Sequence, residues 1–236
     1  MPHHLLKLAA RTLLFCALSL FPVVFHVALA EQDAAASAQD GVASTEFETA
    51  LDWVEQGEFA RAAEVFERLA ARGDAEAQHN LAMLYRKGAG VPRNFEQSVQ
   101  WFRRAAEQGV PDAQYMLGYS YDGGEGVRQS TKWAFIWYRK AAEQGHGLAQ
   151  VNLGVMYANG AGVEQDLEQA YLWFHAAAAQ GYSAALENRQ IVEEALSPER
   201  LATLKTRASE HYKRYVVPFL GKSYRPGNLR GDPQAR

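Results

Sequence analysis

Histidine is the first residue type to test for chemistry in this chain, because it binds metals and transfers protons near neutral pH. Four histidines follow residue 30: His79, His146, His175 and His211. The spacings H-E-x-x-H and H-x-x-E-H, which place zinc ligands on one face of a helix, do not occur in the sequence. The histidine pattern therefore predicts no metal site.

Nucleophiles and paired carboxylates are the next candidates. Cys16 is the only cysteine, and no G-x-S-x-G nucleophile motif is present. Carboxylates such as Glu107 and Glu143 fall on faces that helical periodicity predicts to be exposed. We therefore predict a protein that is not an enzyme and that holds no cofactor.

Three glycine-rich segments resemble phosphate-binding loops at first sight: residues 88–91, 124–127 and 160–163, with the sequences GAGV, GEGV and GAGV. A phosphate loop follows a strand and continues into Lys-Ser or Lys-Thr, and neither feature is present here. Because the segments recur, we interpret them as turns in which glycine supplies a positive φ. The valine is expected to fill the core beneath each turn.

These turns belong to a repeat that organises the chain. Gly73, Gly109, Gly145 and Gly181 follow one another at intervals of 36 residues. A fixed period of this length indicates a stacked array of helix pairs. The three full units are residues 74–109, 110–145 and 146–181.

Each unit is predicted to contain two helices. The first helices begin around Ala77, Ala113 and Ala149 and carry a Leu-Ala/Gly-x-x-Tyr stripe, in which Leu and Tyr share one face. The second helices begin at about Phe95, Thr131 and Leu167 and carry a tryptophan between two small residues, which are alanines except for Ser98 in the first unit. The tryptophans are Trp101, Trp137 and Trp173, and we expect them to pack the helices together.

The flanking segments lack the full pattern. In Ser197-Pro198-Glu199, serine is expected to cap a new helix with proline at its first position. We interpret the basic tail, residues 221–236, as a solvated terminus, with binding to a partner or an anionic surface as the alternative. The segments are a lead-in (31–44), a degenerate helix-pair repeat (45–73), capping helices (182–220) and a basic tail (221–236).

Residues 1–30 have the pattern of a secretory signal peptide. Lys7 and Arg11 precede an apolar run over residues 12–25, and Ala28-Leu29-Ala30 is a cleavage site. We expect cleavage after Ala30, which removes Cys16 and leaves an exported chain without disulfides, periplasmic or secreted. The alternative is an uncleaved membrane anchor, against which Pro22 and His26 in the apolar run argue.

The repeated pattern A-Q-x-x-L-G-x-x-Y-x-x-G-x-G-V, followed by A-x-x-W-F/Y-x-x-A-A-x-Q-G, resembles the Sel-1-like repeat, a relative of the tetratricopeptide repeat. The resemblance implies an all-α fold, a right-handed α/α superhelical solenoid whose first helices line a concave face. It also implies adaptor roles in protein complexes. One cysteine-rich branch of the family is linked to penicillin binding or hydrolysis, and we do not transfer that activity to a chain without mature cysteines.

The expected partner is a protein or peptide. The chain of 236 residues has a net charge of −3 and lacks the basic stripe of a nucleic-acid-binding protein. We also expect no stable membrane insertion after signal cleavage. Asn80 and Asn152 either bind an extended peptide backbone or satisfy neighbouring backbone groups. The residues predicted for the concave face are His79, Asn80, Met83, Arg86, Tyr115, Tyr119, Asp122, Val151, Asn152 and Val155.

Three functions compete at this stage. The first is a non-catalytic binding scaffold exported to the cell envelope. The second is a structural component of an envelope machine, such as a flagellar motor or a secretion assembly. The third is a hydrolase that acts on the cell wall or on β-lactams.

Overall fold

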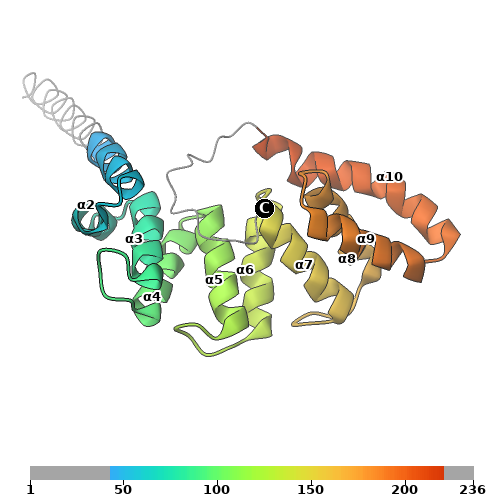
Figure 1. Cartoon of the computed structure of the whole chain (residues 1–236). Helices are drawn as coiled ribbons and strands as arrows, with labels where there is room; N and C mark the ends of the chain where they lie inside the picture. The colour runs from blue at the N-terminus through green and yellow to red at the C-terminus, as the bar shows by residue number, and fades with distance from the viewer. Residues whose placement is uncertain (1–42, 221–236) are drawn as a thin grey trace, which may run out of the picture. The chain divides into compact units, whose positions relative to one another are not determined.

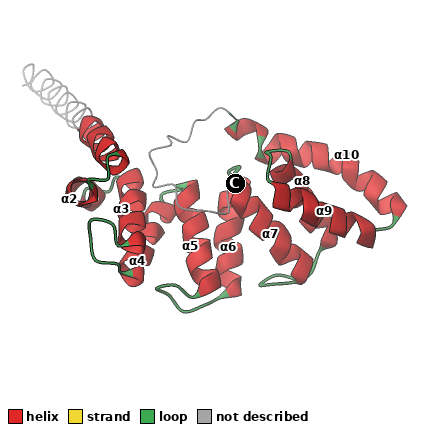
Figure 2. Ribbon diagram, viewed as in Figure 1, coloured by secondary structure: helices red, strands yellow, loops and turns green. Residues whose placement is uncertain are grey.

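The computed structural model describes residues 43–220, and all of the regular structure in that range is helical (Figures 1 and 2). The predicted signal peptide, most of the lead-in and the basic tail lie outside it. Helical residues 43–55 come first, so helix already covers the last two residues of the expected lead-in. Residues from 49 onward form one unit. The helices that follow are α2 (Phe59–Ala71), α3 (Ala75–Lys87), α4 (Phe95–Glu107), α5 (Pro111–Gly123), α6 (Thr131–Glu143), α7 (Gly147–Asn159), α8 (Leu167–Ala178), α9 (Ser183–Ala195), α10 (Pro198–Tyr215) and the short 3₁₀ helix η1 (Val217–Phe219).

Each helix from α3 to α8 packs against the helix before it and the helix after it, so the unit is the predicted α/α solenoid of helix pairs. The second helices α4, α6 and α8 begin at the predicted residues. The first helices begin two residues earlier than predicted, because the helix caps lie earlier. In α3, for example, Asp74 is the N-cap and its Oδ1 accepts a hydrogen bond of 2.7 Å from the Ala77 amide.

The glycine loops are turns, as predicted. Gly88 ends α3 in the left-handed conformation, with φ +70°, and its amide donates to the Leu84 carbonyl. Gly126 has φ +68°, and a Cβ atom at this position would lie 2.2 Å from the Phe95 carbonyl oxygen. The second glycine of the loop is therefore required twice, once by its backbone angle and once by the backbone of the preceding unit.

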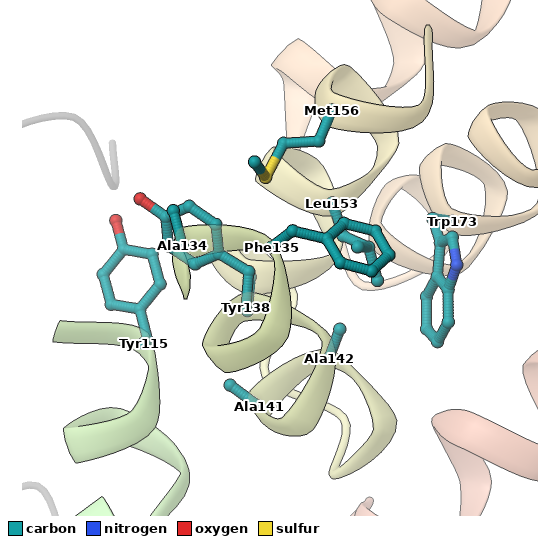
Figure 3. Close-up of a cluster of buried hydrophobic side chains, with 10 residues drawn as sticks. Tyr115, Ala134, Phe135, Tyr138, Ala141, Ala142, Leu153, Met156 and Trp173 are labelled. Carbon is teal, nitrogen blue, oxygen red and sulfur yellow. The ribbon is translucent and has the colours of Figure 1, made fainter. Parts of the chain in front are cut away.

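The small residue of the first helix makes room for an aromatic ring of the second. A Cβ atom on Gly118 would lie 2.7 Å from Cδ1 of Tyr138, and one on Gly154 would lie 2.6 Å from Cε1 of Phe174. Trp137 is 7 % exposed and belongs to this interior, as predicted. Figure 3 shows how the core continues from Tyr115 and Tyr138 past Phe135, Leu153 and Met156 to Trp173.

A ladder of glutamines connects successive units, and its first-helix members Gln78, Gln114 and Gln150 are buried. Gln114 donates through Nε2 to the Ala106 carbonyl at 3.1 Å and accepts through Oε1 from Nε2 of Gln144 at 2.8 Å. The same pair of bonds recurs for Gln78 with Gln108 and for Gln150 with Gln180. The accepting carbonyls at the ends of the second helices also accept a backbone amide, for example that of Gly109 at Ala106, so the glutamines add a second bond at each junction.

The C-terminal helices complete the unit. Ser197 caps α10 as predicted, and its Oγ accepts from the Arg200 amide at 3.3 Å. Leu204 and Ala208 are buried against the preceding helices, and α10 packs on α8. At its end, the ring of Tyr215 lies 5.1 Å from the ring of Trp173.

Candidate protein-interaction surface

Four of the ten residues predicted for the concave face are buried in the folded chain: His79, Asn80, Met83 and Tyr115. A buried side chain presents almost no surface to a partner, so these four do not contribute side-chain contacts to a binding surface in this conformation. The cause is that a first helix packs on several neighbours at once, which makes its buried stripe wider than the Leu-Gly-Tyr positions alone.

His79 illustrates this burial. It is 2 % exposed, and its ring lies 5.6 Å from the ring of Phe102 on α4. Burial lowers the pKa of His79 to about 4, against the opposing effect of the Asp112 carboxylate. His79 is therefore a neutral core residue at physiological pH.

Asn80 and Tyr115 are also occupied internally. Nδ2 of Asn80 donates to the Glu76 carbonyl of its own helix at 2.9 Å, which is the backbone-satisfying role left open by the sequence. The ring of Tyr115 stacks on the ring of His146 with centroids 4.6 Å apart, and it lies 5.7 Å from the ring of Tyr138. Both residues help to hold helices in place.

The structure brings three of the predicted residues together at the C-terminal ends of α3 and α5. The Arg86 guanidinium lies 5.0 Å from the ring centroid of Tyr119, which is 37 % exposed. Asp122 follows one turn after Tyr119 and is exposed. The same guanidinium donates to Oε2 of Glu125, with Nη2 at 3.1 Å. We call Arg86, Tyr119, Asp122 and Glu125 the Arg86–Tyr119 surface.

This surface has properties that favour protein contacts. Tyrosine and arginine are enriched where proteins bind proteins. The contacts with Tyr119 and Glu125 restrict the Arg86 side chain before any partner arrives, which lowers the entropic cost of binding. Asp122, three residues further along α5, adds an exposed carboxylate to the same end of the helix.

Glu125 was missed by sequence reasoning because it lies in the glycine loop, which was interpreted only as a turn. A signal was present, since the equivalent residues in the other two units are Ala89 and Ala161. This loop position is alanine in the first and third units and glutamate in the second. The turn forms with alanine, so the glutamate indicates a role other than forming the turn.

The remaining predicted residues lie on α7. Val151, Asn152 and Val155 are half-buried, and both valines pack against the core beneath α8, α9 and α10. They offer less surface than Tyr119 and Asp122. The third unit therefore contributes mainly packing at these positions.

A second exposed aromatic residue was also missed. Trp133 on α6 is 49 % exposed and stacks on Tyr121, with ring centroids 6.1 Å apart. The Tyr121 hydroxyl accepts from Nη2 of Arg103 at 2.9 Å. The equivalents of Trp133 in the other two units are Gln97 and Gln169. A tryptophan found in only one unit is not required by the repeat, and this difference was visible in the sequence.

The pair most like catalytic machinery is Asp112 with His146, and both ring nitrogens of His146 are engaged. Nε2 of His146 donates to Oδ1 of Asp112 at 2.8 Å, while Nδ1 accepts from the Ala149 amide at 3.1 Å. This tautomer leaves no ring nitrogen to act as a base. Within residues 43–220, no cluster of three or more His, Cys, Asp or Glu side chains is arranged to hold a metal ion. The same residues include no helix that is long and apolar enough to span a membrane.

These features define an all-α helix-pair solenoid. Its three units match the Sel1 repeat family over residues 75–110, 111–146 and 147–182. A Sel1 repeat protein from Oxalobacter formigenes is 30 % identical, with a TM-score of 0.61 over 70 % of this chain and 70 % of the other. The chain belongs to the Sel1 repeat family, whose members generally serve as protein-interaction scaffolds.

A second solved structure supports the same fold. It is a protective antigen present in uropathogenic Escherichia coli strains that displays an SLR fold, 31 % identical to this chain with a TM-score of 0.54. The match covers 77 % of this chain and 48 % of the antigen, so the chain spans about half the length of that relative. No curated protein sequence matches the chain significantly.

Proposed function

We propose that this protein is a non-catalytic scaffold of the cell envelope that binds a protein or peptide through its first helices, at the Arg86–Tyr119 surface. The main support is that residues that recur between units and residues that differ between units lie in different places. The recurring residues of the units are mostly buried in the stack, while Arg86, Tyr119, Asp122 and Glu125 differ between units and gather at one place.

The proposal follows from what such a surface does chemically. A half-exposed tyrosine with an arginine held against its ring offers an apolar face, a hydroxyl and a cation to a partner. In most interfaces a few residues of these types carry much of the binding energy. The role as a scaffold also agrees with the general role of the Sel1 repeat family.

Binding is tested by comparing matched double variants in a pull-down from envelope extract with chemical cross-linking. We expect Tyr119→Ala/Asp122→Ala to lose a partner that the wild-type chain retains. The control is Gln100→Ala/Glu107→Ala, which alters two exposed residues of α4 and should retain that partner. Identical partners for all three proteins would reject the Arg86–Tyr119 surface as the binding site.

Export to the periplasm or the medium is the second part of the proposal and rests on the pattern of residues 1–30. Mass-spectrometric mapping of the N-terminus of the protein made in a bacterial host tests it. A mature chain beginning at Glu31 is expected. A chain beginning at Met1 would reject cleavage and favour an uncleaved anchor.

A further inference from the structure

The chain covers one of its own second helices with a helix of opposite charge. Helix α10 packs on α8 (Figure 1). The Glu168 carboxylate in the first turn of α8 lies 3.0 Å from Nε of Arg200 and 2.8 Å from Nη1 of Arg207. Further along α8, the ring of Trp173 meets the ring of His211 edge to face, with centroids 4.3 Å apart. The contact thus combines ion pairs at the start of a second helix with an aromatic contact beyond them.

The net charge of the second-helix segment is reversed between the third unit and the second. Residues 164–180, which contain α8, have three carboxylates and neither lysine nor arginine, a net charge of −3. Helix α10, which covers α8, has five cations and two carboxylates, a net charge of +3. The equivalent segment of the second unit, residues 128–144, has four cations and one carboxylate and is also +3. Because interfaces pair opposite charges, the second unit is suited to a partner opposite in charge to α10.

The first turn of α6 presents this positive charge beside an exposed aromatic ring. Lys132 is the equivalent of Glu168 and is exposed. Trp133, next to it, is 49 % exposed and stacks on Tyr121, which accepts a hydrogen bond from Arg103. Within residues 43–220, no carboxylate forms an ion pair with Arg103 or Lys132. Together with the exposed loop residue Arg128, these residues form what we call the Trp133 surface: Arg103, Tyr121, Arg128, Lys132 and Trp133.

We propose that the Trp133 surface binds an acidic segment of a partner protein, with a carboxylate of the segment against Lys132 and an apolar side chain on the ring of Trp133. The contact of α10 with α8 supports this, because the chain already uses the equivalent position of the third unit, Glu168, to hold a helix of opposite charge. The same comparison favours a protein segment over an anionic lipid surface. The Trp133 surface is centred on the second helices, so it gives the scaffold a contact separate from the Arg86–Tyr119 surface.

Fluorescence anisotropy with a defined probe tests the proposal. The probe is a dye-labelled peptide in which glutamates flank a central tyrosine, and its companion has glutamine in place of every glutamate. We expect the full-length chain to bind the glutamate peptide about tenfold or more tightly than the glutamine peptide at low salt. Binding should be lost near 1 M salt, where the Debye length falls to about 3 Å.

The variant Lys132→Glu/Trp133→Gln gives the second unit the residues that both other units have at these positions, so the fold should tolerate it. The residues that serve as its model are Glu96, Gln97, Glu168 and Gln169. Affinity for the glutamate peptide should fall by about tenfold or more, as expected when an aromatic residue and a charge are removed from the centre of a contact. The matched control is Lys205→Glu on the exposed side of α10, which changes the net charge equally and should alter the affinity by less than about twofold.

A second variant guards against loss of folding, which circular dichroism monitors. Arg128→Glu introduces the residue that the third unit has at Glu164, and it should also weaken binding of the glutamate peptide. Equal affinities of the wild type and the folded variants would overturn the proposal, as would equal binding of the two peptides or binding of neither. Sedimentation with phosphatidylglycerol vesicles but no binding of the glutamate peptide would also overturn it and assign the surface to an anionic membrane. The probe is a defined peptide, so a failure here leaves the pull-down at the Arg86–Tyr119 surface unaffected.

Discussion

The interior of the helix pairs and the exposed ends of their first helices differ in how strictly the units repeat. In the interior, Gly118 faces Tyr138 as Gly154 faces Phe174, and the glutamine bonds recur with nearly equal lengths. At the exposed ends, Arg86 is replaced by Asp122 and then by Ala158. Packing therefore constrains the residues inside every unit, while the exposed positions are free to differ from one unit to the next.

The largest effect is expected in the interior of the second unit. Trp137→Ala removes a buried aromatic ring and leaves a cavity, so the free energy of unfolding should fall by about 3–5 kcal/mol. Denaturant unfolding followed by circular dichroism measures this loss. A loss below about 1 kcal/mol would mean that the ring contributes little to the core.

The buried His79 should make the free energy of unfolding depend on pH. Its pKa is lowered to about 4 in the folded chain, so between about pH 6.5 and pH 4 the unfolded chain binds a proton that the folded chain does not. Stability from this residue is therefore fully present above pH 6.5 and is lost as the pH falls. The loss is on the order of 3 kcal/mol.

The His79→Phe variant isolates this contribution, because phenylalanine keeps a ring against Phe102 and cannot be protonated. We expect the difference in unfolding free energy between wild type and variant to change between pH 7 and pH 4. Parallel curves for the two proteins would show that His79 is protonated equally in both states.

The glutamine ladder should give an intermediate effect. Gln114→Ala removes the bond to the Ala106 carbonyl and the bond from Gln144. Each bond contributes about 0.5–1.5 kcal/mol, so we expect a loss of about 1–3 kcal/mol in unfolding free energy. Gln100→Ala, on the exposed face of α4, is the matched control and should change stability by less than about 0.5 kcal/mol. Similar losses in the two variants would contradict a structural role for the ladder.

The smallest effect on stability is expected at the exposed ends. Arg86→Ala removes the ion pair with Glu125, and surface ion pairs contribute about 0–1 kcal/mol. The same variant should weaken capture of the partner in the pull-down. A variant that loses several kcal/mol while partner capture stays intact would place Arg86 with the interior instead.

The fold was predictable because its determinants recur. Each 36-residue unit repeats the Gly that ends its second helix, and the tryptophan is buried in the second and third units, while Trp101 is only half-buried. The roles of Gln114 and Gln144 were not visible, because their bond joins residues 30 positions apart in different helices. Recurrence showed that glutamine mattered at both positions without showing that the two side chains meet.

The candidate surface was only partly predictable for a related reason. Helical periodicity assigns one face to the core, but α3 packs against both α2 and α4. His79, two residues before the predicted core residue Leu81, therefore lies inside against Phe102. Tyr119 and Asp122 are exposed, and there the prediction and the exposure agree.

The glutamine ladder has a consequence for how this protein changes in length. Because Gln78, Gln114 and Gln150 each donate in the same way to a carbonyl of the preceding unit, a unit duplicated between Gly145 and His146 would find the same donors and acceptors on both sides. The contacts within a unit do not depend on the number of units in the solenoid. The series ends only where α9 and α10 replace the pattern, so the extent of the surface is a quantity that duplication or deletion of whole units adjusts in steps.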